Sequence, residues 1–331
     1  MIYRPAAFIF CLACIPGANA TDAQDDPFAD AGATPAMVGR GIISTGDDDA
    51  HVTLSPDGRT LYFVKGAPSF DFWAIAASEW RNDRWQPPRI LPFSGRYSDA
   101  DLVFAPDGRH AYFVSTRPVN GVPRTDTEIW RIAYHAKGWG EPEHVAELSS
   151  PGDEWFPTFD RNGVLYFGSS RPGGIGGHDI WRSRQADGVF EKPENLGAPV
   201  NSTGEEIEAL VTPDGALLVF AAKNRGDAVG AYDLYISRRC DGAWSVPGHP
   251  GEPANTYAWE FGPRLSPDGD VIFFTSNRGF APEPRSKAFT FEELQHRVRE
   301  PNNGLRDIYV MKAAALWKHA PRCEETPLPE D

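Results

Sequence analysis

The sequence predicts an all-β protein, a five-bladed β-propeller built from four-stranded antiparallel blades. The segment Ser55–Phe63 (SPDGRTLYF) recurs four more times, which is typical of a repeat architecture. Its glycine returns at intervals of 50, 55, 52 and 54 residues, in turns at 55–58, 105–108, 160–163, 212–215 and 266–269 (Gly58, Gly108, Gly163, Gly215, Gly269). The chain of 331 residues holds 32 Gly and 30 Pro, a composition that suits many short strands joined by turns.

Each repeat contains the parts of one blade. Pro-Asp-Gly favours a tight turn, because proline presets φ and glycine accepts a positive φ, so the turn joins a first and a second strand. A third strand begins with an acid, an apolar residue and an aromatic residue (Asp71, Glu128, Asp179, Asp233 and Asp307). An aromatic residue with a nearby proline marks the fourth strand, at the outer edge where a missing N–H costs little. Such units of about 50 residues predict five propeller blades.

Two segments are candidates for the strands that complete the last blade and so close the ring. Val38–Gly46 aligns with Leu196–Gly204, which follows a fourth strand, so the N-terminal segment is expected beside the last blade. Leu316–Cys323 is expected to supply the outer strand of that blade. Which of the two segments is outermost stays open.

One long insertion interrupts the fifth repeat, between Asn277 and Arg306. Within it, Thr290 and Glu293 have the spacing of a capping box, which predicts a short helix. The insertion is either a packing element or part of a ligand site, because long loops in compact domains are often functional.

The N-terminal residues predict export. Residues 1–20 have the features of a signal peptide, with cleavage expected after Ala20, although Cys14 leaves lipoprotein processing as an alternative. A disordered acidic leader is expected at 21–36, the propeller at 37–323 and a tail at 324–331. The chain is thus expected to be periplasmic or secreted, and no segment is long and apolar enough to span a membrane.

Export leaves two cysteines, Cys240 and Cys323, in an oxidising compartment, either as one disulfide or as two thiols. The formal net charge of −14, without basic clusters, argues against nucleic acid and anionic lipid headgroups as partners.

The repeated turn and the block Ser169–Glu206 resemble the TolB-like β-propeller family with WD40-like Pro-Asp repeats. The resemblance covers residues 38–320, and it implies a non-enzymatic scaffold that binds a partner in the bacterial envelope. Related envelope proteins carry such repeats beside peptidoglycan-binding modules, and no such module is found here. The first repeat also departs from the pattern, because it has Lys65 where the other repeats have an arginine.

A ring of charged residues is the candidate ligand or partner face. An acid lies nine residues before each turn glycine, and the loop after the second strand carries an arginine in four repeats (Asp49, Asp99, Glu154, Glu206, Glu260, Arg117, Arg171, Arg225 and Arg278). These residues either form a charged pocket for a ligand or pair with one another to fix the loops, since arginine binds carboxylates bidentately.

We therefore expect a non-enzymatic module that binds an envelope protein or a small ligand or glycan, without a cofactor or a metal. The alternative is a five-bladed glycoside hydrolase or carbohydrate-binding protein that uses acids at the channel mouth. Trp155 and Trp259, beside two of the acids, are the only indication of an aromatic-lined pocket. No catalytic residue is assigned.

Overall fold

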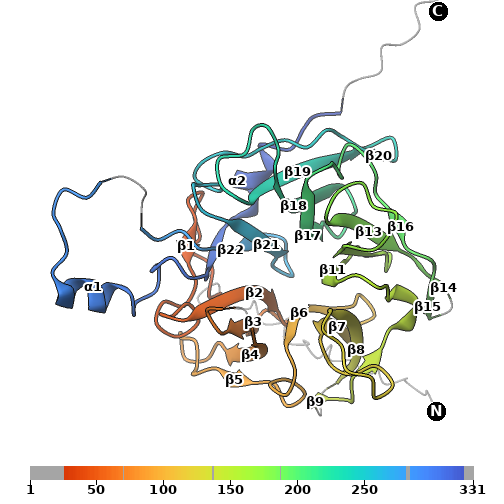
Figure 1. The fold of residues 1–331 in the computed structure, drawn as a ribbon, viewed down its shortest axis with the longest axis horizontal. Coiled ribbons are helices and arrows are strands. Elements are labelled where there is room, and N and C mark those ends of the chain that lie inside the picture. Colours follow the sequence, from red (N-terminus) through yellow and green to blue (C-terminus); the bar gives the residue numbers. More distant parts are fainter. Residues whose placement is uncertain (1–25, 70, 136–137, 187, 281–283, 324–331) are drawn as a thin grey trace, which may run out of the picture.

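The structure is a computed structural model that describes residues 26–69, 71–135, 138–186, 188–280 and 284–323. Five antiparallel sheets of four or five strands each surround a central axis in this part of the chain, as Figure 1 shows. The innermost strands contact one another around the whole ring, the first blade meeting the fifth. The predicted five-bladed propeller is confirmed.

The first three blades follow the order of the repeats. From the innermost strand outward, blade 1 contains β2 (Asp48–Leu54), β3 (Thr60–Gly66), β4 (Trp73–Glu79) and β5 (Arg89–Ile90). In the same order, blade 2 contains β6 (Asp99–Phe104), β7 (His110–Ser115), β8 (Glu128–His135) and β10 (Glu143–His144), with β9 (Gly138–Trp139) also paired to β8. Blade 3 contains β11 (Glu154–Phe159), β12 (Leu165–Ser169), β13 (Asp179–Ser183) and β16 (Glu194–Asn195), with the hairpin β14 (Gln185–Ala186) and β15 (Val189–Phe190).

Blade 4 contains β17 (Glu205–Val211), β18 (Leu217–Lys223), β19 (Asp233–Cys240) and β20 (Ala243–Trp244). Blade 5 contains β21 (Glu260–Leu265), β22 (Val271–Ser276), β23 (Asp307–Lys312) and β1 (Ala36–Met37). A 3-10 turn (Ala146–Leu148) precedes blade 3. The five predicted turns join the first and second strands of their blades, and each turn glycine has a positive φ, which explains why glycine recurs there.

The core lies between neighbouring blades. Val64 of blade 1 and Tyr112 of blade 2 belong to one buried cluster with Phe167 and Trp181 of blade 3. Each sheet therefore buries its two faces against its neighbours, as the aromatic pattern of the repeats implies. The stack of sheets fixes the positions of the inner strands that line the central channel.

The N-terminal segment closes the ring. β1 pairs antiparallel with β23, Ala36 opposite Val310, and is the outermost strand of blade 5. The outer strand expected from Leu316–Cys323 is not formed, because α2 (Ala313–Trp317) occupies its beginning and three consecutive alanines favour helix. Phe28 is buried against Trp85 and Phe273, so the part of the expected leader from residue 26 onward packs on the propeller.

A disulfide joins Cys240 at the end of β19 to Cys323 beyond α2, with the two Cα atoms 5.5 Å apart. It attaches the C-terminal segment to blade 4. Arg238 reinforces this attachment, since its Nε donates to the carbonyl oxygen of Pro321 at 2.6 Å.

The insertion of blade 5 forms the predicted helix, α1 (Phe291–Arg297). Thr290 and Glu293 form both hydrogen bonds of the capping box, and none of the helix residues is buried. Figure 1 shows α1 standing away from the ring of blades. The returning segment is fixed to blade 1 by Asn303, whose Nδ2 donates to the carbonyl oxygen of Gly46 at 3.0 Å.

The expected signal peptide, its cleavage after Ala20, the alternative at Cys14 and the tail at 324–331 lie outside the described residues. Among the residues that are described, no helix has the length and apolar character needed to cross a membrane.

Candidate functional site

The five acids of the predicted charged face are buried, each with a side-chain exposure of 0%. Each carboxylate contacts a cation of its own blade at 2.6 to 3.1 Å (Asp49 with Lys65, Asp99 with Arg117, Glu154 with Arg171, Glu206 with Arg225, Glu260 with Arg278). The structure thus brings together the residues that the repeat pattern singled out, but it places the carboxylates beneath the surface.

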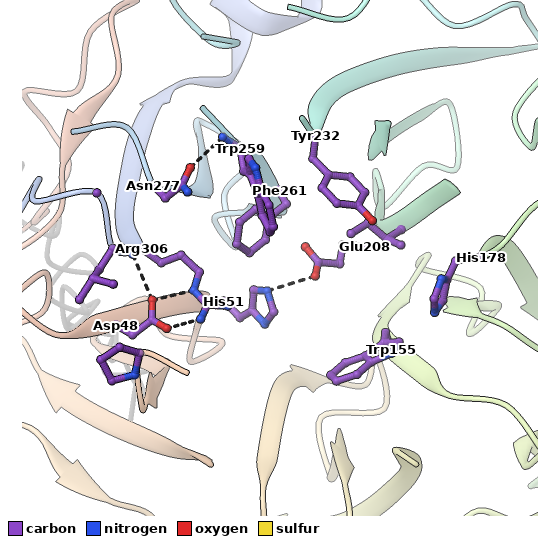
Figure 2. Close-up of a pocket in the computed structure, with 14 residues that line it drawn as sticks. Asp48, His51, Trp155, His178, Glu208, Tyr232, Trp259, Phe261, Asn277 and Arg306 are labelled. Carbon is purple, nitrogen blue, oxygen red and sulfur yellow. Dashed lines mark hydrogen bonds and ion pairs between the residues drawn. The ribbon is translucent and has the colours of Figure 1, made fainter. Parts of the chain in front are cut away.

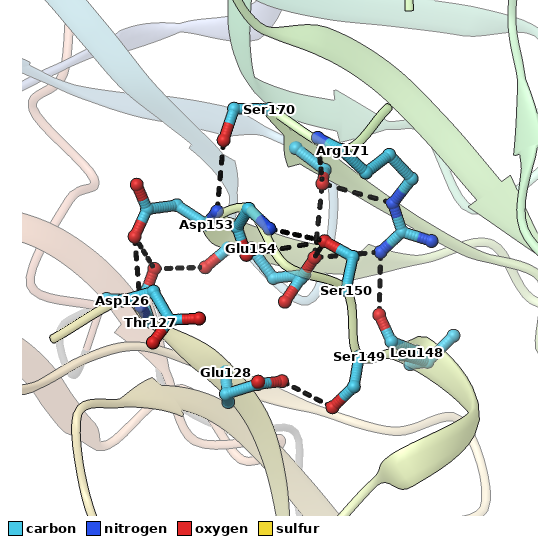
Figure 3. A network of polar contacts seen from close by, with 12 residues as sticks. Asp126, Thr127, Glu128, Leu148, Ser149, Ser150, Asp153, Glu154, Ser170 and Arg171 are labelled. Atoms are coloured by element: carbon cyan, nitrogen blue, oxygen red, sulfur yellow. Dashed lines mark hydrogen bonds and ion pairs between the residues drawn. The ribbon is translucent and has the colours of Figure 1, made fainter. Parts of the chain in front are cut away.

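The acid–cation pair of blade 3, Glu154 with Arg171, shows the contacts that such a pair makes (Figure 3). Arg171 donates to Glu154 at 2.9 Å and to the carbonyl oxygen of Leu148 at 2.6 Å, and its guanidinium lies over the Trp181 ring. Leu148 belongs to the segment that enters from blade 2, so the arginine connects that segment to blade 3. The arginines of blades 2, 4 and 5 bind carbonyl oxygens of the preceding segment in the same way.

The electrostatics agree with a structural role for this ring. Burial raises the pKa of Asp49 and of Asp99, and it raises the pKa of Glu154 to about 8. Asp99 Oδ2 and Glu154 Oε2 have no hydrogen-bond partner among the described residues, but both side chains are 0% exposed, so a ligand has no access to them. The geometry therefore favours loop fixation over a charged pocket at these residues.

A cavity of about 500 Å³ lies instead at the mouth of the channel. Volumes of this size are common for small-molecule sites. Figure 2 shows its lining, which comes from blades 1, 3, 4 and 5 (Asp48, His51, Pro68, Trp155, His178, Ile207, Glu208, Tyr232, Trp259, Phe261, Asn277, Gly304, Leu305 and Arg306).

Two of five equivalent positions on the inner strands, His51 and Glu208, line this cavity. A β-bulge interrupts every inner strand, and the residue at the bulge has a positive φ in each blade (His51, Asp101, Phe156, Glu208 and Gly262). All five lie seven residues before their turn glycine. Bulges re-aim side chains, and here they bring chemically different side chains together in the channel.

His51 connects two carboxylates of this set. Its Nδ1 lies 2.5 Å from Asp101 Oδ1, and its Nε2 lies 3.2 Å from Glu208 Oε1. Burial opposes a charge on the ring, but the carboxylates of Asp101 and Glu208 outweigh it and raise the pKa of His51 to about 10. The imidazole is therefore a cation at neutral pH.

Arg264 is a second buried cation next to these groups. Its guanidinium lies 3.8 Å from the ring centre of Phe156, and its Nη2 donates to the carbonyl oxygen of Pro157 at 2.8 Å. Burial lowers the pKa of Arg264 to about 10, against the opposing effect of Asp101 and Glu208. His51, Asp101, Glu208 and Arg264, here called the channel cluster, carry two positive and two negative charges.

Gly262 leaves the space that His51 occupies. A Cβ at this position would lie 2.9 Å from Cδ2 of His51, and its φ is +63°. A side chain on blade 5 would therefore displace the imidazole. The close approach of the ring requires glycine here, whereas the positive φ alone does not, since non-glycine residues adopt it at the four equivalent positions.

Glu208 lines the cavity from the inner strand of blade 4. Its side chain is 9% exposed, and its Oε2 is buried without a hydrogen-bond partner among the residues that the structure describes. A buried carboxylate oxygen normally accepts hydrogen bonds, because leaving it unpaired costs free energy. A ligand with a hydroxyl or amide donor would satisfy this oxygen.

Aromatic rings form the walls. Tyr232 and Trp259 contact each other edge to face, with ring centres 5.7 Å apart and planes at 67°, and Trp259 is 46% exposed. Trp155 lies on another side of the cavity, as Figure 2 shows, and its ring centre is 6.0 Å from that of Trp73. The hydroxyl of Tyr232 donates to Glu205 at 2.6 Å, which fixes the orientation of the ring.

Asp48 and Arg306 complete the rim. Arg306 binds both carboxylate oxygens of Asp48, with Nε donating to Oδ1 at 2.6 Å and Nη2 to Oδ2. Arg306 ends the insertion and Asn277 begins it, so both stems of the insertion line the cavity. The insertion thereby contributes to the site through its base, whereas α1 stands away from it.

The sequence pattern missed the channel cluster, although it pointed to the tryptophans of the wall. Trp155 and Trp259 both line the cavity. The missing signal was the position seven residues before each turn glycine, where each of the five repeats has a different residue. Three residues of the channel cluster, His51, Asp101 and Glu208, occupy this position in their blades. A search for residues that the repeats share therefore does not detect them.

Comparison with known proteins supports the fold of this chain and shows nothing further about it. No protein-family model matches the chain, and no curated protein matches it. A solved structure of a BT0996 RGII complex matches 93% of this protein and 98% of its own length, with 12% identity and a TM-score of 0.51.

Two further solved structures are more distant. An alpha-L-arabinofuranosidase from Lactobacillus brevis matches 82% of this chain and 92% of its own, with 14% identity and a TM-score of 0.47. A puromycin hydrolase matches 72% of this chain at 16% identity and a TM-score of 0.39, and the match spans only 35% of that protein's length.

Proposed function

We propose that this chain is an exported, non-enzymatic binding module of the bacterial envelope that takes a small molecule into the cavity at its channel mouth. The observation that carries the proposal is Glu208 Oε2, a buried acceptor without a partner among the described residues, at the floor of an aromatic-lined cavity. Buried acceptors of this kind are completed by ligands in preformed pockets.

The proposal favours binding over hydrolysis for a chemical reason. Glycoside hydrolysis by the usual route needs two carboxylates, one acting as acid and one as base or nucleophile. Among the described residues that line the cavity, the carboxylates are Asp48 and Glu208, and Arg306 occupies both oxygens of Asp48. Glu208 therefore has no second carboxylate in the cavity lining that is free to act with it in hydrolysis.

The cellular location belongs to the same proposal. The features of residues 1–20 support export, and the disulfide between Cys240 and Cys323 suits an oxidising compartment. The TolB-like resemblance of the repeats supports the envelope as the place of action.

The test is capture of a small molecule by the mature protein. The protein is incubated with a small-molecule extract of bacterial envelopes, separated by gel filtration, denatured, and analysed for released compounds by mass spectrometry. Wild type is compared with Ile207→Phe, which fills the cavity, and with Ile90→Phe, which adds the same ring at an exposed site on β5.

A compound that wild type and Ile90→Phe retain and Ile207→Phe does not would support the proposal. Equal retention by all three proteins, or retention by none, would overturn it. Circular dichroism melting of each variant checks that the comparison uses folded protein.

A further inference from the structure

The channel-mouth cavity carries information about the chemistry of its ligand, and this inference rests on the proposed function. We infer that the ligand is a neutral carbohydrate, with a ring packed against Trp155 or the Tyr232–Trp259 pair and a hydroxyl donating to Glu208 Oε2.

The charges around the cavity favour a neutral ligand. Three carboxylates (Asp48, Asp101 and Glu208) are balanced by three cations (His51, Arg264 and Arg306), each within a direct ion pair or beside one. An ionic ligand would bring a charge that no side chain of this set is left to compensate. Burying such a charge is costly, whereas a hydroxyl donor is accommodated by one free acceptor.

The walls favour a puckered ring over a flat one. The planes of Tyr232 and Trp259 are inclined at 67°, so the two rings do not form a parallel slot for a planar aromatic ligand. Each instead offers an apolar face or edge in a different direction. Carbohydrates have apolar C–H faces together with hydroxyl groups, and they match a site with aromatic walls and a polar floor.

The floor orients the ligand. Glu208 Oε1 is held by His51, whereas Oε2 has no hydrogen-bond partner among the described residues and can accept a ligand donor. His51 in turn is held between Phe156 and Phe261, with both ring centres 5.5 Å from its own. The acceptor is therefore fixed before the ligand binds, which reduces the entropy lost on binding.

The test is a panel of neutral and acidic oligosaccharides on a printed array, followed by calorimetry with the sugars that bind. We expect binding to neutral sugars, with an affinity at least about tenfold weaker for Glu208→Gln and for Trp259→Ala. Phe291→Ala removes a ring that is 80% exposed on α1, away from the cavity, and is expected to leave the affinity unchanged.

The outcomes separate this inference from the proposed function. Binding only to acidic sugars, or capture from the envelope extract of a compound that is not a carbohydrate, would overturn the inference while the cavity keeps its role. Equal affinity in all variants would overturn the assignment of Glu208 and Trp259. Absence of both array binding and capture would overturn the inference and the proposed function together. Urea unfolding of each variant separates lost binding from lost folding.

Discussion

Glu208 and His51 are joined across the channel by one ion pair, Glu208 Oε1 to His51 Nε2 at 3.2 Å, while Glu208 Oε2 has no hydrogen-bond partner among the described residues. The pair links blade 4 to blade 1, and Asp101 on the other imidazole nitrogen adds blade 2. One imidazolium thus holds three blades together at the channel and also sets the acceptor that a ligand would meet. Glu208 is therefore expected to contribute both to the stability of the fold and to ligand binding.

The charge of His51 predicts a pH dependence of stability. The pKa of His51 in the folded protein, about 10, is raised above its ordinary value of 6.5. The stabilisation is therefore complete below pH 6.5 and is lost as pH rises toward 10. Between pH 8 and 9.5 we expect His51 to lower the free energy of unfolding by about 1.4 kcal/mol per pH unit, measured by urea unfolding.

A neutral version of the cluster is the control for this pH profile. His51→Gln, Asp101→Asn and Glu208→Gln combined remove the imidazole and the two carboxylates that raise its pKa, so the slope in that window should become smaller. Glu154, whose burial raises its pKa to about 8, contributes mainly at lower pH and is unchanged in both proteins. Identical slopes would show that His51 does not titrate as described.

Gly262 should be less tolerant of alanine than another glycine with the same backbone conformation. Gly262 has φ +63° and Gly108 has φ +65°, so both substitutions carry similar backbone strain. Only at Gly262 would the new Cβ approach His51, at 2.9 Å from Cδ2, whereas nothing lies within 4 Å at Gly108. We expect Gly262→Ala to cost about 1–3 kcal/mol more than Gly108→Ala in urea unfolding. Equal costs would mean that the His51 ring moves aside freely.

The acid ring should affect stability without affecting binding. Glu206→Gln combined with Glu260→Gln removes the charge from two buried pairs with Arg225 and Arg278. We expect a loss of about 2 kcal/mol per site and an unchanged ligand affinity per folded molecule, from urea unfolding and calorimetry. A loss of affinity with unchanged stability would instead support the prediction that these acids contact the ligand.

Reduction of the disulfide should loosen the C-terminal segment. Cys240 and Cys323 are 83 residues apart in sequence, so their bond restricts a long loop in the unfolded chain. We expect Cys240→Ser combined with Cys323→Ser to lower the free energy of unfolding by about 2–4 kcal/mol. Treatment of wild type with a reductant should give the same shift and leave the double variant unaffected. No shift in either experiment would contradict a stabilising disulfide.

Much of the fold could be predicted because the repeats impose it five times. The turn glycines, the third-strand acids and the capping box of Thr290 and Glu293 each have a local physical cause that is visible in sequence. The closure was harder, because β1 pairs through only two residues and the alanines before Trp317 favour a helix. Short edge strands carry too little periodicity to be distinguished from coil.

The site could be predicted only in part, because its residues are not shared among the repeats. Repetition drew attention to the acids and arginines that occur in nearly every blade, and these hold the loops. The channel cluster depends on His51, Glu208 and Gly262, which are different residues at equivalent positions of different blades. Their contacts follow from ring closure, which no local pattern encodes.

We propose that Glu208 Oε2 binds a ligand in the channel-mouth cavity. The most direct test is calorimetry of wild type and Glu208→Gln with the compound captured from the envelope extract, with urea unfolding of both proteins as the check on folding. We expect an affinity lowered about tenfold or more in the variant, since one hydrogen bond to a charged acceptor is lost. Equal affinity in two equally folded proteins would contradict it.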